Sequence, residues 1–137
     1  MREKNLDKVS WILIILGSLN YVPVNILRKV GMEQFGSFSF KLLLSLQFYL
    51  NPYIFSMFVL AFLGSLAWTI PFRGNPPTLI VAAILVTLAP VMCLNAFMNV
   101  YLLQEQWSRL AIYGVILISV GFIIAGTGLY ILTKGLI

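Results

Sequence analysis

Charged residues divide this chain into long stretches made mainly of apolar residues. Uncharged runs cover residues 9–27, 42–72, 74–104 and 110–133. Each run is longer than the roughly 18 apolar residues that indicate a membrane-spanning helix. None reaches the length of about 40 residues that two such helices and a turn would need. The pattern therefore predicts four helices that cross a membrane.

Proline and asparagine set the boundaries of these predicted helices. Asn51-Pro52 is a helix-start signal, because Asn caps the free backbone N–H groups and Pro fits the first helical position. The stretch 73–77 is a turn in which Asn75 is expected to cap the next helix, with Pro76 at its first position. The predicted helices lie at about 9–28, 52–72, 76–103 and 110–132.

The segment 35–50 has a different character from the four helices. It mixes Ser, Gln and Lys41 with Phe and Leu. Such a mixture predicts an amphipathic piece that lies at the membrane interface, between the first two spans. The alternative is that the helix at 52–72 begins earlier and tilts.

Composition supports a membrane protein over a soluble one. Of the 137 residues, 61% are hydrophobic and only 9% are charged, and the mean hydropathy is +0.98. Soluble domains are about 25% charged. We therefore predict an all-α membrane protein in which residues 1–137 form a single domain, a bundle of four transmembrane helices.

The residue inventory argues against several functions. The chain has no His and only one Cys, Cys93. The four acids (Glu3, Asp7, Glu33 and Glu105) fall in the tail or in predicted loops. We expect no enzyme activity, no cofactor and no metal site, because nucleophile–base pairs, metal clusters and phosphate-binding glycine loops are missing. The net charge of +5 is scattered over the ends of the spans, which predicts membrane anchoring and no nucleic-acid partner.

Basic residues give only a weak signal for orientation. With four spans both termini lie on one side, which carries five Lys and Arg residues, while the other side carries four: Arg2, Lys4, Lys8, Arg73 and Lys134 against Arg28, Lys29, Lys41 and Arg109. The excess favours a cytoplasmic N-terminus in a bacterial cytoplasmic (inner) membrane. Dual or inverted insertion remains open.

Neutral polar side chains inside the predicted helices are the candidates for substrate binding. They either line a substrate path or form interhelical hydrogen bonds worth about 0.6 kcal/mol each. Asn95 and Asn99 are four residues apart and share one helix face. The adjacent basic residues Arg28 and Lys29 end the first predicted helix, where they either bind a phosphate headgroup or extend to the lipid surface. The candidates are Asn20, Tyr21, Asn25, Arg28, Lys29, Trp68, Asn95 and Asn99.

The last predicted helix carries small residues along one face. Small side chains let helix backbones approach closely in a membrane. This pattern predicts a helix-packing or oligomer contact, and it leaves open whether the partner is in the same chain or another. The residues are Ala111, Gly114, Gly121, Ala125 and Gly128.

Three short motifs resemble the drug/metabolite transporter superfamily. Residues 103–121 read LQEQWSRLAIYGVILISVG, which is similar to the turn and Gly-spaced fourth helix of that group. Arg28-Lys29 with Gly31 resembles its first-helix ending, and Asn51-Pro52-Tyr53 resembles the start of its second helix. Length and span number point to the small branch, which contains small multidrug resistance proteins and paired flippase subunits for undecaprenyl-phosphate-aminoarabinose.

The resemblance implies a particular assembly and function. It implies a homodimer, or a heterodimer with a related four-helix subunit. Small multidrug exporters carry a Glu in the first helix, where this chain has Asn20 or Tyr21, so the lipid-carrier branch is the more similar one. The leading hypothesis is a subunit that moves a lipid-linked or amphiphilic substrate across the membrane, with membrane lipids as partners. The alternatives are an accessory subunit that scaffolds a larger membrane complex, and a small multidrug or cation exporter.

Overall fold

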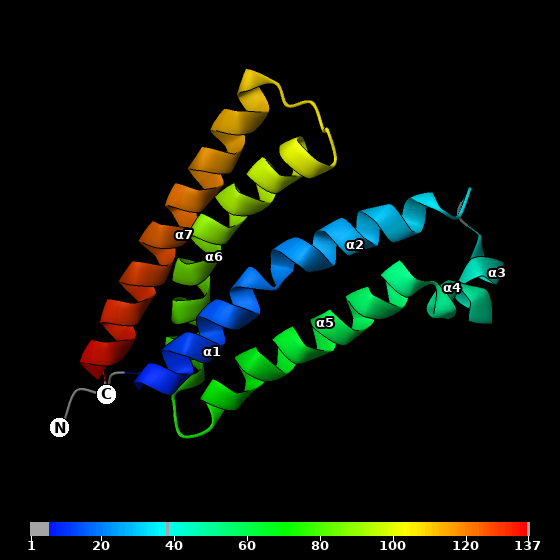
Figure 1. The fold of residues 1–137 in the computed structure, drawn as a ribbon. Coiled ribbons are helices and arrows are strands. Elements are labelled where there is room, and N and C mark those ends of the chain that lie inside the picture. The colour runs from blue at the N-terminus through cyan, green and yellow to red at the C-terminus, as the bar shows by residue number, and fades with distance from the viewer. Residues whose placement is uncertain (1–5, 38, 137) are drawn as a thin grey trace.

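The protein is an all-α bundle whose four longest helical stretches can each cross a membrane (Figure 1). The computed structural model describes residues 6–37 and 39–136. The helical stretches long and apolar enough to span are Lys8–Glu33, Pro52–Phe72, Pro77–Leu102 and Arg109–Thr133. The predicted fold class is confirmed, and the chain is an integral, multi-pass membrane protein. Arg2 and Lys4, used above for orientation, lie outside the described residues, as does the side chain of Lys134.

The first span is longer than predicted and is broken near its middle. It consists of α1 (Lys8–Leu19) and α2 (Tyr21–Glu33), separated at Asn20. Asp7 caps α1, because its side chain accepts a hydrogen bond from the Ser10 backbone N–H at 3.1 Å. Hydrogen bonds from Ser10, first from its side chain and then from its backbone N–H, favour the carboxylate and hold the pKa of Asp7 below its ordinary value. The span ends at Glu33 instead of residue 28, so the basic pair lies inside its last two turns.

Two short helices connect the first and second spans. They are α3 (Phe40–Leu43) and α4 (Leu46–Leu50). Asn51 separates them from α5 (Pro52–Thr69), and its side-chain oxygen accepts from Tyr53 N at 3.0 Å and Ile54 N at 3.3 Å. The predicted start of this span is confirmed, and the alternative in which the helix begins earlier is wrong.

The turn before the third span differs from the prediction. A short 3-10 helix, η1 (Ile70–Phe72), follows α5, and α6 (Pro77–Leu102) begins one residue later than expected. Pro76 adopts an extended conformation because the following Pro77 disfavours the helical region for the residue before it. Asn75 does not cap α6, since its side chain donates to the Pro71 carbonyl at 2.8 Å.

The spans pack as two groups that meet at one end of the bundle. The first group is α1, α2 and α5, and the second is α6 with α7 (Arg109–Leu136). At the end near the start of α1 and the end of α7, a buried cluster joins the groups, and the rings of Trp11 and Tyr130 lie 6.0 Å apart. At the opposite end α2 and α5 diverge from α6 and α7 (Figure 1). The joining cluster consists of Leu6, Ile14, Leu79, Ile80 and Ala83.

The helix α7 packs on α6 through a face other than the predicted one. A Cβ atom at Gly126 would lie 2.7 Å from Val86 Cγ2 and 2.9 Å from the Ala82 carbonyl oxygen, so the two helices touch there. A Cβ atom on any glycine of the predicted face would meet nothing within 4 Å, and the alanines of that face are exposed. The small-residue face therefore makes no packing contact with the residues that the structure describes. It consists of Ala111, Gly114, Gly121, Ala125 and Gly128.

Candidate polar cleft between α2 and α6

A polar cleft of about 540 Å³ opens between α2 and α6, where the two groups of helices diverge. Its walls combine amides, a cation and two carboxylates, whereas the surrounding helix surfaces are apolar. Polar groups inside a membrane protein are costly and commonly mark a substrate path. The lining residues are Asn25, Lys29, Glu33, Asn99, Leu103 and Glu105.

The α2 wall of the cleft comes from helical periodicity. Asn25, Lys29 and Glu33 are spaced four residues apart and therefore share one face. Lys29 Nζ lies 2.6 Å from Glu33 Oε1. Arg28 turns toward the same wall and donates from Nη1 to Asn25 Oδ1 at 2.9 Å. This wall thus holds two basic groups and one carboxylate.

The α6 wall uses the two asparagines that the sequence placed on one face. Asn95 accepts a hydrogen bond from Asn25 Nδ2 at 3.5 Å, which links the two walls. Asn99, one turn later, lines the cleft. Its backbone carbonyl accepts from the N–H groups of Leu103 at 3.1 Å and Glu105 at 3.2 Å, and these bonds close the end of α6. The second bond fixes the backbone of Glu105 at the mouth of the cleft.

The turn that positions Glu105 contains a strained residue. Gln104 has a φ of 53°, in the left-handed region that glycine adopts easily after a helix. We expect Gln104→Gly to stabilise the protein by about 1 kcal/mol, because a side chain at such a position costs roughly 1–2 kcal/mol. Thermal unfolding in mild detergent measures the gain. Gln104→Ala is the matched control, since it keeps a Cβ atom and should leave stability near that of the wild type.

The ion pair in the cleft is weak enough to open for a ligand. The side chains of Lys29 and Glu33 are 58% and 64% exposed. Exposed pairs of this kind contribute about 0–1 kcal/mol. Lys29 can therefore exchange its contact with Glu33 for a ligand anion at small cost, and Glu33 is then free to accept from a donor on the same ligand.

Three of the predicted site residues lie elsewhere. Asn20, Tyr21 and Trp68 line a separate hollow of about 470 Å³ between α1, α2 and α5. The Asn20 side-chain amide donates to the Leu60 carbonyl, and Trp68 Nε1 donates to the Ile14 carbonyl at 3.2 Å. Both polar groups thus tie the helices of the first group together.

The structure brings together five of the predicted residues and adds three that the sequence reasoning missed. Asn25, Lys29 and Asn99 line the cleft, and Arg28 and Asn95 are hydrogen-bonded to its wall. Glu33, Leu103 and Glu105 also line it. The spacing of four residues between Lys29 and Glu33 is the signal that could have revealed the acidic part of the site.

The part of the chain that the structure describes holds no group of three His, Cys, Asp or Glu side chains arranged to bind a metal ion. Ser18 and Thr87 form a hydroxyl pair at 2.7 Å between α1 and α6. Comparison with known proteins adds no assignment, because no protein-family model, curated protein or solved structure matches the chain.

Proposed function

We propose that this chain is a subunit of a small-bundle transporter that moves a lipid-linked amphiphile across the cytoplasmic membrane. The observation that carries the proposal is the polar cleft between α2 and α6, in a molecule whose other surfaces are mainly apolar. A headgroup with phosphate and hydroxyl groups matches the basic and amide groups of the cleft. The hydrocarbon tail would stay in the lipid.

The cleft suggests how the headgroup would be held. Lys29 supplies a charge-assisted donor for a phosphate oxygen. The amides of Asn25 and Asn99 can donate to and accept from sugar hydroxyls. Glu33 and Glu105 accept from further hydroxyl or amine donors. Rocking of the two groups of helices about their common end would expose the cleft to one side and then the other, as in transporters built from paired bundles.

A second subunit has a free surface available on α7. The small-residue face defined above is open, and small residues allow close contact between membrane helices. We propose that a second copy, or a related four-helix subunit, packs there and completes the transporter.

Asn99→Leu tests the cleft directly. The substitution keeps the side-chain size but removes the hydrogen-bonding groups, so we expect transport to slow about fivefold for each hydrogen bond lost. The measurement uses reconstituted vesicles that contain a short-chain polyprenyl phosphate sugar. Membrane-impermeant periodate cleaves the outer pool of the sugar, and the rate at which the inner pool becomes sensitive reports transport.

Gln47→Leu is the control for this experiment, because Gln47 is an exposed amide on α4 and does not line the cleft. It should transport like the wild type. Equal rates for Asn99→Leu and wild type, or no transport by the wild type above empty vesicles, would contradict the proposal.

A second candidate function is that of an accessory subunit in a larger membrane complex. It is favoured by the segment of α3 and α4, in which Phe40 of α3 is 78% exposed and Leu44, between the two helices, is 87% exposed. Exposed apolar side chains on a connecting segment offer a docking surface to a partner protein. Absence of transport together with stoichiometric co-purification of an unrelated membrane protein would support this function over the first.

A further inference from the structure

Charges of opposite sign lie on the two sides of the polar cleft. Lys29 belongs to the α2 wall, and Glu105 lines the cleft from the loop that follows α6. In this structure Lys29 pairs with Glu33 on its own helix. Glu105 is exposed, and it is close enough for its negative charge to act on the Lys29 ammonium group. Lys29 therefore has two carboxylates within its range, one on its own wall and one across the cleft.

The α2 wall is joined to α5, so these two helices move together. A Cβ atom at Gly31 would lie 2.7 Å from Ile54 Cδ1, which shows that α2 and α5 touch near their ends. The Asn51 side-chain amide also donates to Gln34 Oε1 at 2.8 Å, and this bond links the end of α2 to the start of α5. Any movement of Lys29 toward Glu105 therefore carries α5 with it.

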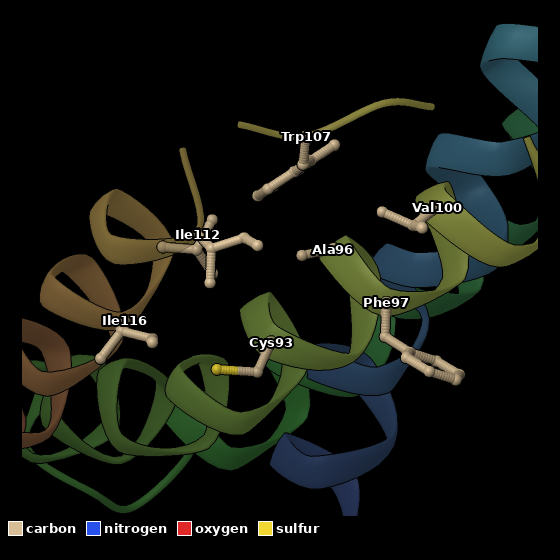
Figure 2. A pocket seen from close by; sticks show the side chains of 8 residues that line it. Cys93, Ala96, Phe97, Val100, Trp107, Ile112 and Ile116 are labelled. Atoms are coloured by element: carbon tan, nitrogen blue, oxygen red, sulfur yellow. The ribbon is translucent and has the colours of Figure 1, made fainter. Parts of the chain in front are cut away.

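Glu105 is joined to the other group of helices. Its backbone N–H donates to the Asn99 carbonyl of α6 at 3.2 Å. Two residues later, Trp107 extends from the loop over the hollow between α6 and α7 that Ala96 and Ile112 also line (Figure 2). Glu105 consequently moves with α6 and α7, and its separation from Lys29 reports the separation of the two groups.

The existing contact between the two walls would improve if the cleft narrowed. Asn25 Nδ2 and Asn95 Oδ1 are 3.5 Å apart, whereas N–H···O bonds are usually about 2.9–3.0 Å long. An approach of α2 to α6 would shorten this bond and bring Lys29 nearer to Glu105 at the same time. Leaving Glu33 costs Lys29 little, because that pair is exposed.

From these contacts we infer that the empty cleft closes by an exchange of ion pairs, in which Lys29 leaves Glu33 and pairs with Glu105 across the cleft. Closure removes water from between the two charges and so strengthens their attraction. The inference rests on the proposed function only for the ligand, whose phosphate would compete with Glu105 for Lys29. The closure itself can be measured without transport.

A distance measurement between the two groups tests the exchange. Spin labels are attached at Phe55→Cys on α5 and Leu102→Cys on α6, two exposed positions, in a Cys93→Ser background. Double electron–electron resonance in phosphatidylcholine vesicles should show a long and a short distance. Glu105→Gln should lower the ratio of short to long about two- to fivefold, the range for an exposed ion pair. Lys41→Gln is the control, because it removes an exposed charge that does not line the cleft.

Glu33→Gln makes the same chemical change as Glu105→Gln and should have the opposite effect. It removes the competing partner of Lys29, so the short distance should become more frequent. A closed empty carrier is part of alternating access, so this shift is compatible with undiminished transport. Lys29→Gln should act like Glu105→Gln, and the double variant should lose no more than either single one, because the two changes remove the same interaction.

The outcomes separate this inference from the proposed function. A single long distance in the otherwise unchanged protein would overturn the ion-pair exchange. A Glu105→Gln distribution equal to that of Lys41→Gln, or shifts in the same direction for Glu33→Gln and Glu105→Gln, would also overturn it. Adding the polyprenyl phosphate sugar should make the short distance less frequent. If the variants shift as expected and this addition changes nothing, the exchange stands and the proposed headgroup binding is wrong.

Discussion

Gly126→Val is expected to force α7 away from α6 and to destabilise the protein by about 3 kcal/mol, the upper range for overpacking a tight contact. The added Cβ atom would meet the Ala82 carbonyl oxygen at 2.9 Å and the Val86 backbone nitrogen at 3.0 Å. Backbone atoms inside a helix cannot move aside as a flexible side chain can. Thermal unfolding followed by circular dichroism in mild detergent should show a fall of roughly 10 °C in the midpoint.

Gly121→Val is the matched control, because it makes the same change on the same helix where a Cβ atom meets nothing within 4 Å. We expect its effect on the stability of the single chain to stay within about 0.5 kcal/mol. If a second subunit packs on the small-residue face, this variant alone should lower the mass of the native particle. Equal loss of stability in the two variants would show that the described contact of α7 with α6 is wrong.

Lys29→Gln is expected to reduce transport of the polyprenyl phosphate sugar by roughly ten- to a hundredfold. A hydrogen bond from a charged donor contributes about 1.5–3 kcal/mol, and the substitution removes the charge that would bind phosphate. The periodate assay in vesicles measures the rate. The fold should be unaffected, since the exposed contact with Glu33 contributes little to stability.

Glu33→Gln separates a binding role of Lys29 from a structural one. It removes the same ion pair but leaves the lysine available to the headgroup. The Gln amide oxygen can still accept from a headgroup hydroxyl, so we expect transport by Glu33→Gln to equal or exceed that of the wild type. Equal losses in the two variants would mean that the ion pair matters only for structure, and they would contradict the proposed binding role of Lys29.

The spans could be predicted from the sequence because their physical cause is local. A helix that crosses lipid must satisfy its own backbone hydrogen bonds, so length and apolar composition are sufficient to identify it. Asn51 likewise caps the helix that immediately follows it, and this prediction is confirmed by its contacts with Tyr53 and Ile54.

The helix contacts could not be predicted, because they depend on packing between distant segments. Lipid is as apolar as the helix surface, so no polar contrast shows which face meets a neighbour. The repeated small residues of α7 indicated a packing face that is open in the structure, whereas α7 contacts α6 at Gly126. The break at Asn20 has a local origin instead, because Pro23 has no backbone N–H to donate to the carbonyl of Leu19, four residues earlier.

The cleft was predictable only in part for the same reason. Spacing placed Asn95 and Asn99 on one face, and it also would have aligned Glu33 with Lys29. The approach of α2 to α6 depends on tertiary packing, because the hydrogen bond between Asn25 and Asn95 joins residues that are seventy positions apart. Tyr21 and Trp68 were grouped with these residues by polarity alone, and the fold places them in another hollow.

The two helix groups meet at one end of the bundle and diverge at the other, so a rotation of one group about the common end moves its far end furthest. The helix α6 has 26 residues and is therefore about 39 Å long. A rotation of about 10° at the cluster around Ile14 and Leu79 would displace the far end of α6 by roughly 7 Å over that length. A small change in the packing of a few aliphatic side chains would thus be magnified into a large change in the width of the cleft.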